Sequence, residues 1–219
     1  MNKYIDIHSH SGSPSAMTIV NCFPAEIEAA LKNQPQQTFS VGLHPWYINS
    51  DFKKELETVT LFANHTQVLA IGEAGLDKVC EIPFELQQKI FIHQAKLAES
   101  IQKPLIIHCV KAYSELIHLK KELHPTIPWV LHGYRGNKEI TQQLLPYNFY
   151  FSFGKGISLL QESIKLIPLD RIFLETDDEE INIEEVYASV NNLLHFPDCL
   201  LRNQIKKNFE SLFIKSKSK

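Results

Sequence analysis

The chain alternates short apolar runs with longer segments in which apolar residues recur every three or four positions. The short, β-branched-rich runs predict buried strands, and the longer segments predict amphipathic helices. Strands are expected at Lys3–His8, Met17–Cys22, Thr38–Leu43, Val68–Gly72, Pro104–His108, Pro128–His132, Phe149–Phe153 and Arg171–Glu175. Helices are expected at Pro24–Asn33, Asp51–Asn64, Pro83–Ile101, Tyr113–Leu123, Asn137–Leu145, Ser158–Leu166, Ile183–Leu194 and Arg202–Phe213. This alternation is typical of parallel α/β folds and predicts a (β/α)8 TIM-type barrel.

The segment between the first two predicted strands is too short for a crossover helix. It runs from Ser9 to Ala16 and contains Gly12 and Pro14. The chain as a whole, at 219 residues, is shorter than the ~250 residues typical of this barrel. We therefore expect a trimmed barrel whose first crossover helix is missing or vestigial. Residues 1–213 are predicted to form one domain, followed by a flexible basic tail at residues 214–219.

Metal-ligand residue types stand at the ends of these predicted strands. His8 and His10 are two positions apart, so their side chains point to one face of a strand. Separate apolar runs precede the others, which are Glu73, His108, His132 and Asp177. Because the carboxyl ends of barrel strands meet at one mouth, these side chains are expected to converge there. One His-x-His pair carries little weight in a chain with ten His, so the recurrence at five strand ends is the main argument.

This constellation predicts a hydrolase with two divalent cations. Two cations held about 3.5–4 Å apart need a bridging anion, and the two oxygens of Glu73 suit that role. The expected ligands of one cation are His8, His10 and Asp177, and those of the other are His108 and His132. Mixed imidazole and carboxylate ligation suits Zn, Mn, Fe or, less well, Mg. Asp177 is expected to orient or deprotonate the attacking water, so Asp177 and Glu73 are the predicted catalytic residues.

Other chemistries and locations find less support in the sequence. It has no Gly-x-Ser-x-Gly elbow, no phosphate loop with a following Lys-Ser/Thr and no His-Glu-x-x-His motif. Its net charge of −3 gives no global basic footprint, although a nuclease needs only local cations around the scissile phosphate. The four cysteines show no C-x-x-C spacing, and no apolar run is long enough to cross a bilayer. A cytoplasmic location is expected, with no membrane and no obligate protein partner.

Seven ordered segments resemble the motifs of the TatD family of metal-dependent hydrolases and deoxyribonucleases. They are Ile5–His10, Val41–Trp46, Ile71–Asp77, Pro104–Cys109, His132–Gly136, Phe151–Ile157 and Leu174–Asp177. The resemblance implies a TIM-type barrel of the metal-dependent hydrolase superfamily, with divalent metals on the six residues above. It also implies phosphodiester cleavage in DNA, in some members as a 3′–5′ exonuclease. DNA, single-stranded or at its ends, is therefore the expected substrate.

Four further residues are candidates for substrate binding. His44 ends the third predicted strand, and the resemblance suggests that it lies beside the substrate or supports a metal ligand; the alternative is a structural His that bonds a loop carbonyl. Lys111, Arg135 and Lys155 follow the fifth, sixth and seventh strands and are expected to hold phosphate oxygens. For each of these cations the alternative is a solvated position at the rim.

The chain departs from the family pattern at two places. Val110 and Lys111 stand where the family has a basic and an acidic residue, and Asp178–Glu180 stands where it has a small residue, Pro and an aromatic residue. Three added carboxylates would repel a polyanion. A second hypothesis therefore stays open, in which the same barrel hydrolyses a small ester, amide or lactone. A non-catalytic barrel is disfavoured, because no metal ligand has been replaced.

Overall fold

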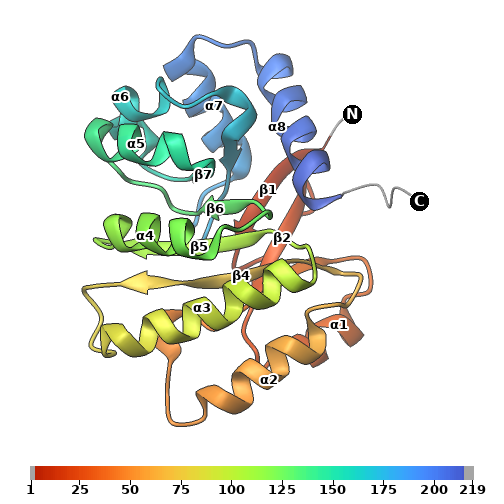
Figure 1. Cartoon of the computed structure of the whole chain (residues 1–219). Coiled ribbons are helices and arrows are strands. Elements are labelled where there is room, and N and C mark those ends of the chain that lie inside the picture. Colours follow the sequence, from red (N-terminus) through yellow and green to blue (C-terminus); the bar gives the residue numbers. More distant parts are fainter. Residues whose placement is uncertain (1–2, 215–219) are drawn as a thin grey trace.

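The computed structural model describes residues 3–214, which form a single sheet of parallel strands surrounded by helices (Figure 1). The strands are β1 (Tyr4–Ser9), β2 (Ala16–Cys22), β3 (Thr38–Val41), β4 (Val68–Asp77), β5 (Leu105–Val110), β6 (Trp129–Leu131), β7 (Phe149–Phe153) and β8 (Ile172–Leu174). Each strand pairs with the next along the chain, so the order in space equals the order in sequence. A bridge between Ser9 and Asp177 joins β1 to the end of β8 and nearly closes the barrel.

Helices cover the outside of the sheet, as the amphipathic segments predict. They are α1 (Ile27–Asn33), α2 (Phe52–Phe62), α3 (Phe84–Ser100), α4 (Tyr113–Leu123), α5 (Lys138–Leu144), α6 (Gln161–Ile164), α7 (Ile183–Leu194) and α8 (Asp198–Phe213). Short 3-10 turns are η1 (Pro45–Tyr47), η2 (Leu145–Tyr147), η3 (Ile157–Leu160) and η4 (Leu169–Arg171). The final helix α8 returns to pack beside β1 and β8 (Figure 1). None of the described helices combines the length and apolar composition needed to cross a bilayer.

The predicted (β/α)8 barrel is confirmed, and no helix lies between β1 and β2 in the described chain. The clearest difference concerns β4, which was expected to end at Gly72 and instead continues to Asp77. A register shift between Ile71 and Ala74 lets β4 keep pairing with β5. Gly72, with φ +140°, permits this shift, since a Cβ there would lie 2.5 Å from the carbonyl oxygen of Ile106. Glu73 therefore lies within a strand.

Two helices differ in extent from their predicted segments. The segment expected to be one helix at Ser158–Leu166 begins as the 3-10 turn η3 and has only one α-helical turn, α6. Ile157, Leu160 and Ile164 keep helical spacing toward the core, so the amphipathic pattern holds although the first turn is tighter. Helix α8 begins at Asp198, four residues before the predicted start. The one-domain prediction stays a prediction, and of the expected tail only Ile214 lies within the described residues.

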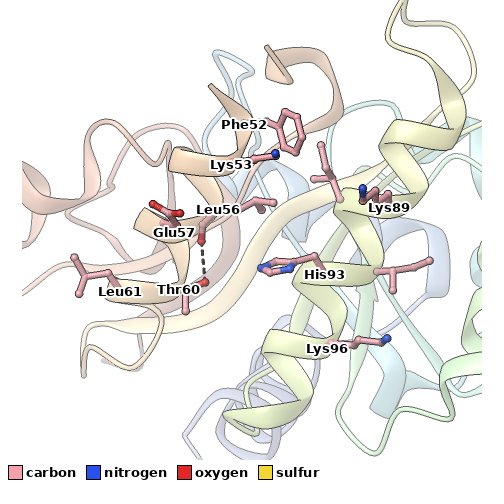
Figure 2. Close-up of a pocket in the computed structure, with 11 residues that line it drawn as sticks. Phe52, Lys53, Leu56, Glu57, Thr60, Leu61, Lys89, His93 and Lys96 are labelled. Carbon is pink, nitrogen blue, oxygen red and sulfur yellow. Dashed lines mark hydrogen bonds between the residues drawn. The ribbon is translucent and has the colours of Figure 1, made fainter. Parts of the chain in front are cut away.

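A second hydrophobic cluster lies outside the barrel, between α2 and α3. Its buried members are Leu43, Ile48, Leu56 and Ile90. Above it runs a groove of about 750 Å³ with Lys53, Lys89 and Lys96 along its edges (Figure 2). This cluster anchors the loop after β3 that carries His44.

Candidate metal centre

β1 delivers two imidazoles to the mouth of the barrel. His8 is completely buried, whereas His10, one residue beyond the strand, has 34% of its side chain exposed. Below His8 on the same face lies Asp6, whose Oδ2 accepts a 2.7 Å hydrogen bond from the Thr176 hydroxyl. Burial and the nearby charge of Glu175 raise the pKa of Asp6 to about 7, in spite of the hydrogen bonds from Thr176.

Glu73 lies at the centre of the mouth, with its two carboxylate oxygens facing different imidazoles. Oε1 lies 3.1 Å from His108 Nδ1 and 2.6 Å from His132 Nε2, while Oε2 lies 3.4 Å from His8 Nε2. The backbone N–H of Glu73 donates to the Asn21 side chain at 3.0 Å. Burial alone would raise the pKa of Glu73, but the charge of His132 and hydrogen bonds from neighbouring imidazoles hold it well below its ordinary value.

His108 is oriented by a carboxylate that lies farther along β4. Its Nε2 lies 3.1 Å from Asp77 Oδ2, and the same oxygen accepts a 2.6 Å hydrogen bond from the Trp46 indole. Since an ionised carboxylate can only accept, His108 Nε2 donates to Asp77, and Nδ1 is the ring nitrogen that faces Glu73. Although burial raises the pKa of Asp77, the hydrogen bonds from Trp46, Val79 and His108 lower it overall.

His132 has a comparable carboxylate behind it. Its Nδ1 lies 3.6 Å from Oε1 of Glu175, which is fully buried and accepts a hydrogen bond from the Gly133 backbone N–H. Burial lowers the pKa of His132, but the charge of Glu73 and the contact with Glu175 raise it well above the ordinary value. The ring of His132 lies 4.2 Å from that of His8, centroid to centroid. A positive charge is therefore favoured on this side of Glu73.

Asp177 closes the cluster from β8. Its Oδ1 lies 3.4 Å from His8 Nε2 and 3.6 Å from His10 Nε2. Burial would raise its pKa, but the close contact with His8 and the charges of His132 and His8 lower it to about 2. The same contacts act on His8, whose pKa rises to about 9 because Asp177 and Glu73 outweigh burial and the charge of His132.

His44 contacts the cluster as a hydrogen-bond donor. Its Nδ1 accepts from the backbone N–H of Trp46 at 3.1 Å, so the neutral ring carries its proton on Nε2. That nitrogen lies 3.1 Å from Glu73 Oε1. Burial lowers the pKa of His44 in spite of the nearby Glu73 carboxylate, which favours this neutral form. The ring thus bonds a loop N–H and Glu73, and not the loop carbonyl considered above.

The donor set fits divalent cations. Within residues 3–214, three groups of ligand atoms lie within 4.8 Å of one another. They are His8 with His132 and Asp177, His8 with His10 and Glu73, and His44 with Glu73 and His108. Both ring nitrogens of His8 and of His132 are buried without a well-formed hydrogen bond in this part of the chain. Buried nitrogens in that state are costly, and a cation would use their lone pairs.

The three predicted phosphate contacts lie differently around the mouth. Arg135 and Lys111 are exposed and line a cavity of about 540 Å³ that also includes Glu73, His108, His132 and Asp177. Lys155 lies outside that cavity, and its Nζ forms a 2.6 Å ion pair with Glu179. Asp178 lines the cavity as well. The structure thus brings two of the three cations to the same opening as the carboxylates and imidazoles.

Sequence reasoning missed the residues that support this cluster. Glu175 stands two positions before Asp177, a spacing that puts both on one face of an extended chain. Asp77 stands four positions after Glu73, but the strand expected at Val68–Gly72 stops short of it. Two buried glutamines of α3 fix the adjacent backbone. Gln94 exchanges hydrogen bonds with both backbone groups of Leu43 at 2.7 and 3.0 Å, and Gln87 does so with Asp77 at 2.8 and 3.0 Å. No local sequence signal indicates the last two.

Comparison with known proteins identifies the family. Residues 8–214 match the family model described as TatD related DNase. A metal-dependent hydrolase of Buchnera aphidicola is 33% identical over 204 residues, covering 84% of this chain and 76% of that protein. The 3′-5′ ssDNA/RNA exonuclease TatD of Citrobacter koseri is 29% identical over 149 residues, covering 63% of this chain and 56% of that protein.

A solved structure agrees with this match. YjjV, the TatD homologue of Escherichia coli, superposes with a TM-score of 0.86 at 24% identity, covering 98% of this chain and 99% of that chain. At that identity the superposition shows the fold alone. The chain spans only slightly more than half the length of the Citrobacter enzyme, 56%. With a family model that matches nearly its whole length, the chain belongs to the TatD-related family of metal-dependent hydrolases and deoxyribonucleases.

Proposed function

We propose that this protein hydrolyses phosphodiester bonds in DNA with two divalent cations at the barrel mouth. The observation that carries the proposal is the position of Glu73, whose Oε1 faces His108 and His132 while Oε2 faces His8. A carboxylate that faces two imidazole groups in this way is suited to bridge two cations. The family membership of the chain supports the same chemistry.

The proposed ligands divide along the two oxygens of Glu73. His108 and His132, which face Oε1, would hold one cation, and His8, His10 and Asp177 would hold the other. Four imidazoles against two carboxylates favour Zn, Mn or Fe over Mg, which prefers oxygen ligands. Asp77 and Glu175 support the two imidazoles on the Oε1 side, as acceptors behind ligating His residues commonly do. His44 positions Glu73 through its Nε2–H.

The roles in catalysis follow from these positions. Two divalent cations, when bound, supply Lewis-acid stabilisation of the phosphate charge and make water a nucleophile at neutral pH. Asp177, with one carboxylate oxygen near His8 and the side chain partly open to the cavity, accepts the proton of the attacking water. Arg135 and Lys111 hold phosphate oxygens at the rim. The Lys155 ion pair with Glu179 makes that lysine a weaker contact than the sequence alone suggested.

The substrate assignment rests on the rim and on the relatives. The Citrobacter relative is described as an exonuclease on single-stranded DNA and RNA. A single strand suits a cavity of about 540 Å³ better than a duplex, because splayed nucleotides enter it one at a time. The acidic segment Asp178–Glu180 favours the second candidate, a small ester or lactone. Its effect is limited, because Glu179 is neutralised by Lys155.

One experiment separates these candidates. Metal-stripped protein is reloaded with Mg, Mn or Zn and assayed on end-labelled single-stranded DNA, duplex DNA, RNA, and a panel of small phosphodiesters, esters and lactones. The expected result is metal-dependent cleavage of oligonucleotides that is lost in Glu73→Gln, with Glu139→Gln, at an exposed position outside the cavity, as the matched control. Efficient cleavage of a small ester or lactone beside inert oligonucleotides would replace the nuclease assignment with the second candidate.

A further inference from the structure

The opposite end of the barrel, where the strands begin, holds a second cavity of about 550 Å³. It lies among the segments that precede β6, β7 and β8, so the whole length of the barrel separates it from Glu73. Its lining includes four basic residues, Lys120, Lys121, His124 and Arg171, and one acidic residue, Asp170. Lys120, Lys121 and Arg171 thus bring three positive charges to this cavity against one carboxylate.

Two of these cations share one neutral partner. Lys120 Nζ donates to the backbone carbonyl of Asn148 at 3.2 Å, and Arg171 Nη2 donates to the Asn148 side-chain oxygen at 3.0 Å. Arg171 Nη1 donates to the carbonyl of Leu145 at 3.0 Å. Among residues 3–214, no carboxylate lies within 4 Å of either cation. Two cations are thus held close together by neutral oxygens only.

The position of Lys120 is unfavourable for its charged amine, which is largely buried and lies near Arg171. Its Nζ lies 4.1 Å from the ring centre of Phe149 and 5.3 Å from that of Trp129, at the floor of the barrel. Burial, together with the charge of Arg171, lowers the pKa of Lys120 to about 7. Cation–π contacts offset part of the lost hydration. An anion between Lys120 and Arg171 would relieve their mutual repulsion.

A purely structural role explains why Lys120 and Lys121 are cations, but not why their amines face the cavity. Lys120 and Lys121 are in the last turn of α4, where cations offset the negative end of the helix dipole. That accounts for their charge, but the Lys120 amine turns away from the helix toward Asn148 and the rings. Lys121 lies 4.8 Å above the ring of Tyr147 and likewise faces the cavity. The half-buried rings of Tyr147 and Tyr150 give the cavity an apolar wall.

We propose that this cavity binds a phosphate group, either as inorganic phosphate or as a phosphate monoester, between Lys120, Lys121 and Arg171. Guanidinium and ammonium groups together match the geometry and charge of a phosphate dianion. The tyrosine rings provide a surface for a sugar or a base when the phosphate belongs to a nucleotide. The site is independent of the metal centre, because none of its lining residues is shared with the catalytic cavity.

The test follows the reactivity of Lys120 in the intact protein. An amine-reactive reagent is applied at pH 7 with increasing inorganic phosphate, with a deoxynucleoside monophosphate, or with KCl at matched ionic strength, and labelling is mapped by mass spectrometry. Phosphate is expected to slow labelling of Lys120 about tenfold, the effect of one charge-assisted hydrogen bond. Exposed Lys138, paired with Glu162, serves as the internal control and should be unaffected. Stronger protection by the nucleotide would identify it as the ligand, and equal protection would identify free phosphate.

Variants locate the protecting site. Lys121→Ala should raise the half-protecting phosphate concentration about tenfold, and Lys138→Ala should leave it unchanged. Arg135→Ala, in the catalytic cavity, should also leave it unchanged. Equal protection by KCl, loss of protection in Arg135→Ala, or a Lys120 that the reagent never reaches would each overturn the proposal.

Discussion

Asp177 contacts β1 through its backbone as well as through its side chain, and His8 is its partner in both. The Asp177 N–H donates to the carbonyl of His8 at 2.9 Å, and the Asp177 carboxylate lies 3.4 Å from His8 Nε2. The His10 N–H donates in turn to the Asp177 carbonyl at 3.0 Å. The contact that nearly closes the barrel is therefore the contact that assembles one half of the metal centre. Closure of the fold and formation of the site depend on the same few atoms.

This relationship predicts that Asp177→Asn lowers turnover without disrupting the contact that closes the barrel. Asp177 has φ +57°, a conformation that Asn adopts readily, so the backbone closure should survive. Loss of the proton acceptor should lower turnover by about 10²–10⁴-fold. The melting temperature should change little, and some metal should stay bound through the remaining ligands; both are measured on the same preparation. Asp51→Asn, at an exposed position outside the cavity, is the control, and substantial turnover in Asp177→Asn would remove Asp177 from the proton-accepting role.

Glu73→Gln should be more damaging than His44→Ala. The first change removes the charge that both cations share, so we expect loss of most bound metal together with activity. The second removes one donor to Glu73, and loss of such supporting contacts typically costs about 10–100-fold. Metal content by mass spectrometry and kcat at saturating metal measure both effects. A fully active Glu73→Gln enzyme would contradict the bridging role.

Asp77→Asn should weaken metal binding through His108. The amide can offer its N–H to His108 Nε2, which would shift the imidazole proton to Nδ1 and block the nitrogen that faces Glu73. We expect the dissociation constant of the cation that His108 would hold to rise about 10–100-fold. Competition with a fluorescent chelator measures this constant without an activity assay. Trp46→Phe keeps the Asp77 carboxylate and should show a smaller effect; an unchanged constant in Asp77→Asn would show that Asp77 does not orient His108.

The strand ends show most clearly which parts of the site could be predicted from the sequence. His8, His10 and Asp177 could be predicted to converge because parallel strands end at one mouth, whatever their exact register. The support of His108 by Asp77 could not be predicted, since it depends on the register shift at Gly72 that extends β4 by five residues beyond the expected end. The pairing of Lys155 with Glu179 likewise depends on loop conformation, which periodicity does not encode.

Metal binding should release protons and tighten as the pH rises. In the metal-free protein the pKa of His8 is raised to about 9, so at pH 7 its ring is protonated. A cation takes the Nε2 lone pair only after that proton leaves, so apparent affinity should increase by up to about tenfold per pH unit between about 7 and 9. Above the raised pKa this dependence should vanish. Calorimetry in two buffers of different ionisation enthalpy counts the protons, and binding without proton release would refute the assignment of His8 as a ligand.

The salt dependence of DNA binding should distinguish the rim cations. Each phosphate contact on a single strand contributes about −0.7 to the slope of log affinity against log salt, so Arg135 and Lys111 together predict about −1.4. Arg135→Ala should flatten the slope by about 0.7, measured by fluorescence anisotropy on a labelled oligonucleotide with a catalytically inactive Asp177→Asn background. Lys155→Ala should change the slope little, because Lys155 is already paired with Glu179. Glu179→Gln should free that lysine and tighten binding, most at low salt where screening is weakest. If the slope is unchanged in Arg135→Ala but flatter in Lys155→Ala, DNA does not bind along the cavity that Arg135 lines.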